Sequence, residues 1–331
     1  MSAAAGGEGA VTYLAAIRRA MWDAMESDER VFMIGEDIGT YGGAFRVTQG
    51  FLERFGEERV IDTPISESAI VGAAIGAAMM GRRPVVEMQF IDFIACAFNQ
   101  IVNFAAPNHY RWGPAVPMVV RGPCGGNVHG SAFHSQNPEG FFHRAPGLKI
   151  VAPATVADAY GLMRSAIDDL NPVLFFEHKY LYRRVKAELP ENPAPVDIGK
   201  ARIAREGKDL SVITYGAMLH VALEAAEILS GDGIELEVLD LRTLKPLDDE
   251  AILATVRKTN RVLVLNEEPR TGSLAGEVAA RIAESAFEWL DGPVQRLTCL
   301  DTPVPYSPPM EAFYLPNVEK LVAQVRQLSS Y

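Results

Sequence analysis

Two histidines lie in a glycine-rich loop that follows a predicted buried strand. The strand is the apolar run 118–121, and the loop continues from Gly122 to Gln136 with His129 and His134 inside it. Polar loops held by a rigid scaffold often carry binding and catalytic residues. A histidine in a loop is more often structural or solvated than catalytic, so residue type and spacing leave both roles open for this pair.

Glu67 begins a run of small and apolar residues that predicts a helix over 67–80, with Ser66 as its N-cap. A carboxylate in the first turn of a helix is favoured by the helix dipole, which alone could explain its presence. In an apolar pocket, however, a carboxyl group gains proton affinity and can exchange a proton with a ligand nitrogen. Glu67 is therefore either a first-turn residue or a proton-transfer group.

One flank of the same predicted helix has little side-chain bulk. Gly72, Ala73, Gly76 and Ala77 form this flank, and small residues let helix backbones approach closely. We expect it to pack against another helix, either inside the domain or in another subunit.

Two further candidates lie at the boundaries of predicted elements. Glu36 follows the predicted strand 31–34, and ligands of open parallel sheets bind at the carboxyl ends of the strands. Phe93 opens a predicted helix over 93–106. Taken singly, Glu36 is equally a turn residue and Phe93 an ordinary core aromatic.

The triplet Gly231-Asp232-Gly233, followed by Asn260, resembles a motif that holds metal and diphosphate in thiamine-diphosphate enzymes. In that motif the triplet follows a strand and opens a helix. Here it follows a predicted helix over 220–230 and precedes a predicted strand over 235–241. The triplet is therefore expected to be a helix-to-strand turn, with glycine as the C-cap of the helix.

Short apolar strands alternate with helical stretches along most of the chain, which indicates parallel sheets flanked by helices. The first set has strands at 31–34, 60–61, 84–87, 118–121, 148–152 and 173–176, with helices at 11–27, 67–80, 93–106 and 158–168. The second set has strands at 210–215, 235–241 and 261–265, with helices at 220–230, 248–255 and 272–287. The expected fold class is α/β, with an N-terminal doubly wound, mostly parallel sheet and a smaller C-terminal three-layer α/β domain.

A proline-rich stretch separates the two sets of elements. Pro190, Pro193 and Pro195 suit neither a helix interior nor a central strand. We therefore expect a disordered tail over 1–10, a first domain over 11–185, a linker over 186–206 and a C-terminal domain over 207–331.

The composition indicates which partners and which cellular compartment to expect. The formal charge of −11 disfavours nucleic acid and anionic membranes as partners. Cys96, Cys124 and Cys299 are far apart and have no metal-ligand spacing, so neither disulfides nor zinc are indicated. The first residues match no signal or transit peptide. We expect a protein of the bacterial cytoplasm that binds neither nucleic acid nor membrane.

Several short motifs follow one another in an order that is typical of one family. They are Gly35-Glu36-Asp37, Ile61-Asp62-Thr63-Pro64-Ile65-Ser66-Glu67, Gln89-Phe90-Ile91-Asp92-Phe93, His134-Ser135-Gln136, Leu239-Asp240-Leu241-Arg242-Thr243 and Asp301-Thr302-Pro303. In these motifs the chain resembles the β subunits of the thiamine-diphosphate-dependent, decarboxylating component of 2-oxo acid dehydrogenase complexes. That family has an N-terminal pyrimidine-binding domain and a C-terminal transketolase-like domain, in agreement with the two sets of elements.

The resemblance implies a thiamine diphosphate shared with an α subunit, which holds the diphosphate and the magnesium ion. Glu67 would hydrogen-bond a ring nitrogen of the aminopyrimidine and exchange a proton with it, and Glu36 would support Glu67. Ile65 and Phe93 would contact the ring. His134 would assist transfer of the acyl group to a lipoyl group.

The same resemblance implies an α2β2 heterotetramer that works with a lipoyl acyltransferase core. Family members often bind a structural potassium ion through backbone carbonyls, and the matching positions here are Met118, Ala166, Asp169 and Asn171. Two departures from the family pattern, at Asn99 and at Ala106-Pro107-Asn108, put the local helix geometry in doubt.

The residues around His134 favour one substrate class. The stretch 128–136 and the ending near 313–316 look closer to branched-chain enzymes than to pyruvate enzymes, so branched-chain 2-oxo acids are the expected substrates. A pyruvate or acetoin dehydrogenase β subunit is the alternative. Two hypotheses of other classes remain. A non-catalytic assembly subunit is disfavoured because Glu67 and His134 are intact. A complete one-chain transketolase-type enzyme is disfavoured because the glycine triplet does not lie between a strand and a helix.

Overall fold

The computed structural model describes residues 9–331, which form two compact units. The N-terminal unit consists of the described residues up to Cys124 together with Phe141–Ile198. The C-terminal unit consists of Gly125–Gly140 and Gly199–Tyr331. The loop with the two histidines thus belongs to the same unit as the C-terminal residues. The expected tail over 1–10 lies almost wholly outside the described residues.

Parallel strands with nearly continuous apolar sequences form the sheet of the N-terminal unit, in the order β6-β7-β5-β4-β2-β3. Such sequences are typical of strands that are buried on both faces. In this register Gly35 is paired with both Asp62 and Glu87, and Glu87 with Arg121. The carboxyl ends of these strands therefore meet at one edge. The strands are β2 (Val31–Gly35), β3 (Val60–Asp62), β4 (Arg83–Glu87), β5 (Val119–Cys124), β6 (Lys149–Val151) and β7 (Val173–His178).

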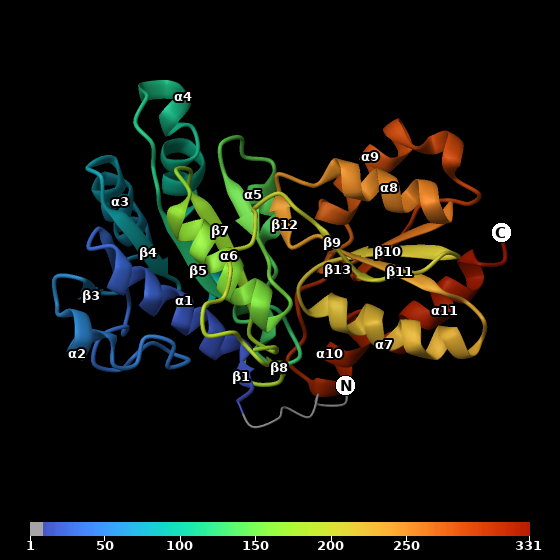
Figure 1. Ribbon diagram of the computed structural model, residues 1–331, viewed down its shortest axis with the longest axis horizontal. Coiled ribbons are helices and arrows are strands. Elements are labelled where there is room, and N and C mark those ends of the chain that lie inside the picture. The colour runs from blue at the N-terminus through green and yellow to red at the C-terminus, as the bar shows by residue number, and fades with distance from the viewer. Residues whose placement is uncertain (1–8) are drawn as a thin grey trace. The chain divides into compact units, whose positions relative to one another are not determined.

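The longest helices of this unit are α1 (Tyr13–Ser27), α3 (Glu67–Met79) and α6 (Val156–Asp168). Threonine side chains cap α1 and α6, since Thr12 and Thr155 each accept a hydrogen bond from a first-turn N–H. Helices α1 and α6 pack side by side, while α3 packs on β4 (Figure 1). The shorter elements are β1 (Val11–Thr12), which pairs with β8 (Lys186–Ala187), α2 (Phe51–Phe55), α4 (Asn108–Trp112) and α5 (Glu139–His143).

The single helix expected over 93–106 is wrong as a continuous α-helix. The chain forms a 3₁₀ helix at Ile91–Ala97 and a π-helix at Gln100–Ala105. At its end the N–H of Ala106 reaches back to the carbonyl of Ile101, and a Cβ at Gly147 would lie only 2.0 Å from the Ala106 carbonyl oxygen. Close backbone contact and a following proline, which has no N–H, both disturb regular α-helical hydrogen bonding here.

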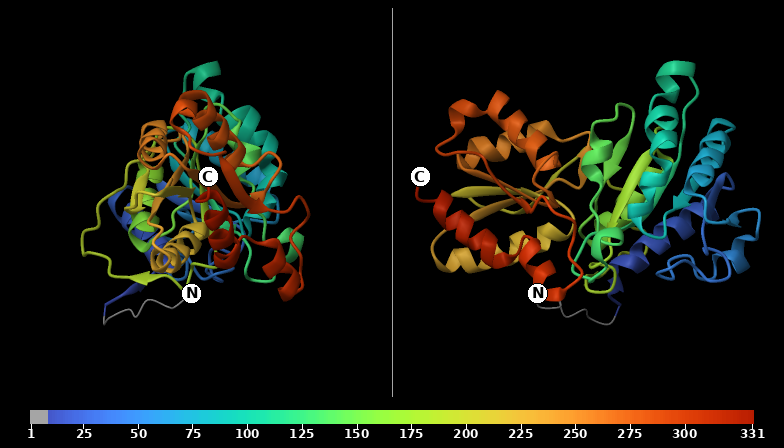
Figure 2. Two further views of the ribbon diagram at one scale, coloured as in Figure 1. Left: turned by 90° about the vertical axis from the view of Figure 1, so that its right-hand side faces the viewer. Right: turned by 180° about the vertical axis from the view of Figure 1, so that it is seen from behind.

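The C-terminal unit has three layers. Its sheet has the order β14-β13-β10-β11-β9, in which only β9 is antiparallel to its neighbour. Helices α8 and α9 cover one face and α7 and α11 the other, as Figures 1 and 2 show. The elements are β9 (Arg202–Arg205), β10 (Leu210–Thr214), α7 (Ala217–Gly231), β11 (Leu236–Asp240), β12 (Thr243–Lys245), α8 (Asp249–Thr259), β13 (Val262–Pro269), α9 (Leu274–Ser285), a 3₁₀ turn (Phe287–Trp289), β14 (Gln295–Cys299), α10 (Pro308–Tyr314) and α11 (Val318–Leu328).

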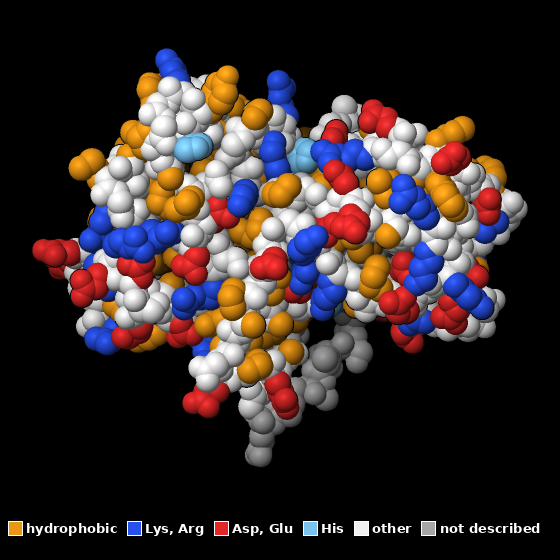
Figure 3. Space-filling view, turned by 45° about the horizontal axis from the view of Figure 1, so that its top comes forward, with side chains coloured by type: hydrophobic (Ala, Val, Ile, Leu, Met, Phe, Trp, Pro, Cys, Tyr) orange, Lys and Arg blue, Asp and Glu red, His pale blue; other side chains and the backbone are white. Residues whose placement is uncertain are grey.

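Acidic and basic side chains are mixed on one face of the molecule. On the face in Figure 3, Lys and Arg side chains lie among Asp and Glu side chains, with apolar side chains between them. Among residues 9–331, no helix combines the length and the apolar character that crossing a bilayer requires.

Candidate active site

A buried carboxyl group lies at the carboxyl edge of the parallel sheet. Glu36 directly follows β2 and is only 7 % exposed, and its Oε1 has no hydrogen-bond partner among the described residues. Burial raises the pKa of this carboxyl, and the neighbouring charge of Glu67 raises it further, although a hydrogen bond from the backbone N–H of Ser66 opposes the shift. Glu36, Ser66 and Glu67 therefore meet in one place, and Glu36 holds a buried oxygen that is available to a ligand.

Glu67 is the first residue of α3, as the sequence predicts. Ser66 occupies the N-cap position, but its side chain makes no capping hydrogen bond. Its backbone N–H donates to Glu36 instead. The start of α3 is thus tied to the end of β2, and Glu67 is half-buried beside Glu36.

The two apolar residues predicted to contact a ring differ in exposure. Ile65 is 83 % exposed, and Phe93 is half-buried in the 3₁₀ helix Ile91–Ala97. The amide of Gln89 donates to the carboxylate of Asp37 at 2.8 Å, which links the segment after β4 to the turn after β2. An exposed isoleucine beside half-buried acids is suited to contact with a ligand or another chain.

A buried ion network lies at the same edge, at the ends of β4, β5 and β7. Arg121 is 1 % exposed and donates to the carboxylates of Glu87 and Glu177. The Tyr182 hydroxyl donates to Glu177 at 2.6 Å. Burial raises the pKa of Glu87 although Arg121 opposes the shift. Sequence reasoning missed both glutamates; the available signal was an acid at the end of each apolar strand.

Two adjacent glutamates at the end of β13 hold the segment Gly125–Gly140 of the C-terminal unit, which contains His129 and His134 and is called the histidine loop. Glu267 accepts hydrogen bonds from the backbone N–H of Gly126 at 2.6 Å and from the side chain of Asn137 at 3.2 Å. Glu268 accepts from the N–H of Gly140 at 2.7 Å. The segment Gly125–Gly140 is therefore fastened at both ends by buried carboxylates.

A third glutamate holds the middle of the loop. Glu311 of α10 is 1 % exposed and accepts a hydrogen bond from the N–H of Asn127 at 3.0 Å, and its Oε2 lies 2.6 Å from Nδ1 of His129. The His129 side chain is 51 % exposed. An imidazole whose Nδ1 faces a buried carboxylate is held in one orientation.

His134 lies in the same loop, half-buried, directly after the 3₁₀ turn Ser131–Phe133. Of the predicted residues, the structure shows Glu36 and Glu67 as neighbours. Glu36, Ile65, Glu67 and Phe93 belong to the N-terminal unit, and His134 to the C-terminal unit. The roles that the resemblance gives to these residues stay predictions.

Glu139, in the same loop, is a buried acid whose Oε2 has no hydrogen-bond partner among the described residues. Burial raises its pKa well above the usual range, and the charges of Glu268 and Glu267 add to the shift. The folded chain therefore binds this proton more tightly than the unfolded chain. The resulting stability is fully present below the unfolded pKa and is lost as pH rises through the folded pKa.

Glu139→Gln is expected to raise the melting temperature at pH 8–9 by a few degrees, equivalent to roughly 1–3 kcal/mol of unfolding free energy, because the amide carries no charge to bury. The gain should shrink as pH falls toward about 5, where the carboxyl of the native protein is protonated. Melting curves of both proteins across this pH range check it, with the exposed Glu319→Gln as control. A gain that is independent of pH would contradict it.

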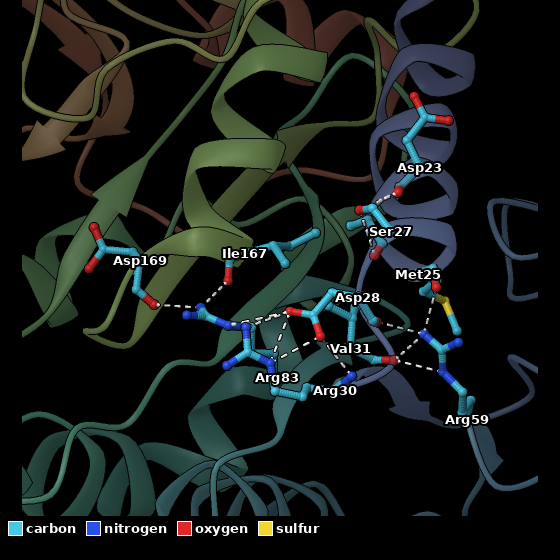
Figure 4. A network of polar contacts seen from close by, with 11 residues as sticks. Asp23, Met25, Ser27, Asp28, Arg30, Val31, Arg59, Arg83, Ile167 and Asp169 are labelled. Carbon is cyan, nitrogen blue, oxygen red and sulfur yellow. Dashed lines mark hydrogen bonds and ion pairs between the residues drawn. The ribbon is translucent and has the colours of Figure 1, made fainter.

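The potassium prediction concerns carbonyls near the end of α6, where Arg83 also lies (Figure 4). The guanidinium of Arg83 donates to the carbonyls of Ile167 at 2.6 Å and Asp169 at 3.2 Å, and the Met118 carbonyl accepts from a backbone N–H. The Asp169 carbonyl, one of the predicted ligands, therefore already accepts a hydrogen bond from a cationic side chain. A potassium ion held by Met118, Ala166, Asp169 and Asn171 stays a prediction.

The triplet Gly231-Asp232-Gly233 is confirmed as a helix-to-strand turn. Gly231 is the last residue of α7, and Gly233 at φ +80° precedes β11, but the C-cap is Asp232 and not the predicted glycine. The Asp232 carboxylate accepts hydrogen bonds from Arg326 at 2.6 and 3.0 Å. The carboxylate that would be the metal ligand therefore already pairs with an arginine.

Comparison with known proteins matches both units to described domains. Residues 9–185 match the transketolase pyrimidine-binding domain, and residues 199–321 match the transketolase C-terminal domain. The chain is 51 % identical to the 2-oxoisovalerate dehydrogenase subunit beta of Bacillus subtilis, over 97 % of this chain and 99 % of that protein. The chain belongs to the family of 2-oxo acid dehydrogenase β subunits. The family assignment made from the motifs is thus confirmed.

Other members of the family are also similar. Identity is 43 % to a mitochondrial 2-oxoisovalerate dehydrogenase subunit beta of Arabidopsis thaliana (96 % of this chain, 88 % of that protein). It is 42 % to the pyruvate dehydrogenase E1 subunit beta of B. subtilis (97 % and 99 %). A solved split-gene transketolase in an inactive β4 tetramer has a TM-score of 0.78 at 23 % identity, covering 97 % of this chain and 98 % of that one. This last likeness confirms the two-domain α/β fold.

Proposed function

We propose that this chain is the β subunit of a thiamine-diphosphate-dependent dehydrogenase of branched-chain 2-oxo acids. It would take part in oxidative decarboxylation and in transfer of the acyl group to a lipoyl group. The observation that carries the proposal is the Glu36–Glu67 pair at the carboxyl edge of a pyrimidine-binding domain, with a buried Glu36 oxygen that lacks a partner.

The residues at this edge fit an aminopyrimidine ring. Glu67 would hydrogen-bond a ring nitrogen and exchange a proton with it, and the nearby Glu36 carboxyl, whose Oε1 has no partner among the described residues, would support Glu67. Ile65 and Phe93 would contact the faces of the ring. Thiamine diphosphate, when bound, supplies the electron sink that decarboxylation needs.

An α subunit would complete the site and hold the diphosphate and magnesium. The flank of α3 supports this partner, because Gly72, Ala73 and Gly76 are exposed and no atom lies within 4 Å of a Cβ built at Gly76. The expected close helix contact would therefore form with another subunit. We propose an α2β2 heterotetramer that works in the bacterial cytoplasm with a lipoyl acyltransferase core.

The identities favour branched-chain substrates over pyruvate. The chain is 51 % identical to a 2-oxoisovalerate dehydrogenase subunit of B. subtilis and 42 % to a pyruvate dehydrogenase subunit of the same organism. Pyruvate is the alternative, because each extra carbon in an apolar pocket discriminates by only about 1–3 kcal/mol and the two substrates differ by two carbons.

The test is decarboxylation of 3-methyl-2-oxobutanoate and of pyruvate with an artificial electron acceptor, measured for this chain alone and for its complex with a co-expressed α subunit. We expect activity only in the complex, with kcat/KM higher for the branched acid by at least about 10-fold, because its isopropyl group has two more carbons than the methyl group of pyruvate. Preference for pyruvate would overturn the substrate. Activity of the lone chain with magnesium would contradict the proposal that the site is shared with an α subunit, and would support the hypothesis of a complete one-chain enzyme.

A further inference from the structure

Glu311 fixes a three-residue stretch of the histidine loop. Its Oε1 accepts the N–H of Asn127 at 3.0 Å, and its Oε2 accepts the N–H of His129 at 3.3 Å and lies 2.6 Å from Nδ1 of His129. A buried carboxylate costs free energy unless hydrogen bonds satisfy it. The carboxylate and the loop therefore stabilise each other.

The backbone of this stretch adopts a conformation that non-glycine residues rarely take. Asn127, His129 and Ser131 have φ values of +63°, +59° and +60°. Asparagine and histidine tolerate the left-handed region better than most residues, but the conformation still costs free energy at each such residue. The hydrogen bonds to Glu311 offset that strain and hold the backbone where it is.

Gly130 packs directly against His134. A Cβ at Gly130 would lie 2.8 Å from the carbonyl oxygen of His134 and 3.0 Å from its Cβ, so the two backbones are in close contact. The N–H of His134 also donates to the carbonyl of Ser131. Movement of His129 would therefore move His134.

We propose that Glu311 and His129 are positioning residues for His134. The buried carboxylate orients the His129 imidazole and the strained backbone beside it, and the packing of Gly130 carries that orientation to the His134 imidazole. The inference rests on the proposed function, in which His134 assists acyl transfer to a lipoyl group while Glu67 serves the earlier decarboxylation.

The test compares two rates of the assembled complex with its α subunit. One is decarboxylation with an artificial acceptor, and the other is acylation of a free lipoyl domain. In His129→Ala and Glu311→Gln we expect the acylation rate to fall by about 10–100-fold relative to decarboxylation, because small displacements of a catalytic group have effects of that size. His129→Asn should restore most of the acylation rate, since its side-chain amide can still donate to Glu311.

Asp232→Asn is the matched control, because it changes an exposed carboxylate that is hydrogen-bonded by Arg326, in a turn away from the histidine loop in sequence. It should leave both rates unchanged. A parallel fall of both rates, or an unchanged ratio in His129→Ala, would overturn the proposal. If Glu311→Gln does not fold, the His129→Ala and His129→Asn pair decides alone. A wild-type complex without decarboxylation would instead refute the proposed function.

Discussion

Glu67→Gln is expected to lower decarboxylation by the assembled complex by roughly 10²–10⁴-fold, the usual effect of removing a proton-transfer group. An amide keeps the size of the side chain and can still hydrogen-bond, but it cannot exchange a proton at neutral pH. The neighbouring Glu36 interacts with the charge of Glu67, but it is buried and cannot exchange protons with solvent in place of Glu67. Turnover of 3-methyl-2-oxobutanoate with an artificial acceptor measures the loss.

The controls separate chemistry from helix stability. Glu319 is an exposed first-turn acid of α11, so Glu319→Gln removes the same helix-dipole interaction without touching the sheet edge. It should leave turnover unchanged. Gel filtration should show that the Glu67→Gln chain still binds its α subunit. Undiminished turnover in Glu67→Gln would support the assembly-subunit reading instead.

The sheet edge was predictable from the sequence because its signals are local. Glu36 follows an apolar strand and Glu67 opens an apolar helix, so both lie where parallel strands end. The structure adds that Ser66 donates its backbone N–H to Glu36 and makes no side-chain cap. That detail depends on how β2 and β3 are paired, which periodicity does not reveal.

The support of the histidine loop was not predictable. Glu267 binds Gly126 across 141 residues of sequence, and Glu311 binds Asn127 across 184. In the sequence these glutamates look like ordinary surface acids, since charged residues are almost never fully buried unless they are paired. Only the tertiary structure shows that they are buried and that the loop's N–H groups are their partners.

Arg121→Met is expected to destabilise the N-terminal unit by about 3–5 kcal/mol, because it leaves the buried carboxylates of Glu87 and Glu177 without their cation. Arg121 joins the ends of β4, β5 and β7, so loss of stability should come with loss of turnover. Calorimetry of the assembled complex would show the unfolding transition moved down by roughly 10 °C. Arg326→Met removes the exposed partner of Asp232 and should change stability by at most about 1 kcal/mol.

A triple change distinguishes an unpaired charge from lost packing. Replacing Arg121, Glu87 and Glu177 together by methionine removes all of the buried charge while keeping similar volume, and such replacements are often neutral or stabilising. The buried Tyr182 hydroxyl loses its acceptor in this variant, at a cost of about 1–3 kcal/mol. We expect the triple variant to melt within a few degrees of the wild type, far above Arg121→Met alone. If the triple variant melts as low as Arg121→Met, the packing of the arginine stem stabilises the strands, and the ion pairs do not. If it is stable but inactive, the charges instead serve the chemistry at the sheet edge, beside Glu36 and Glu67.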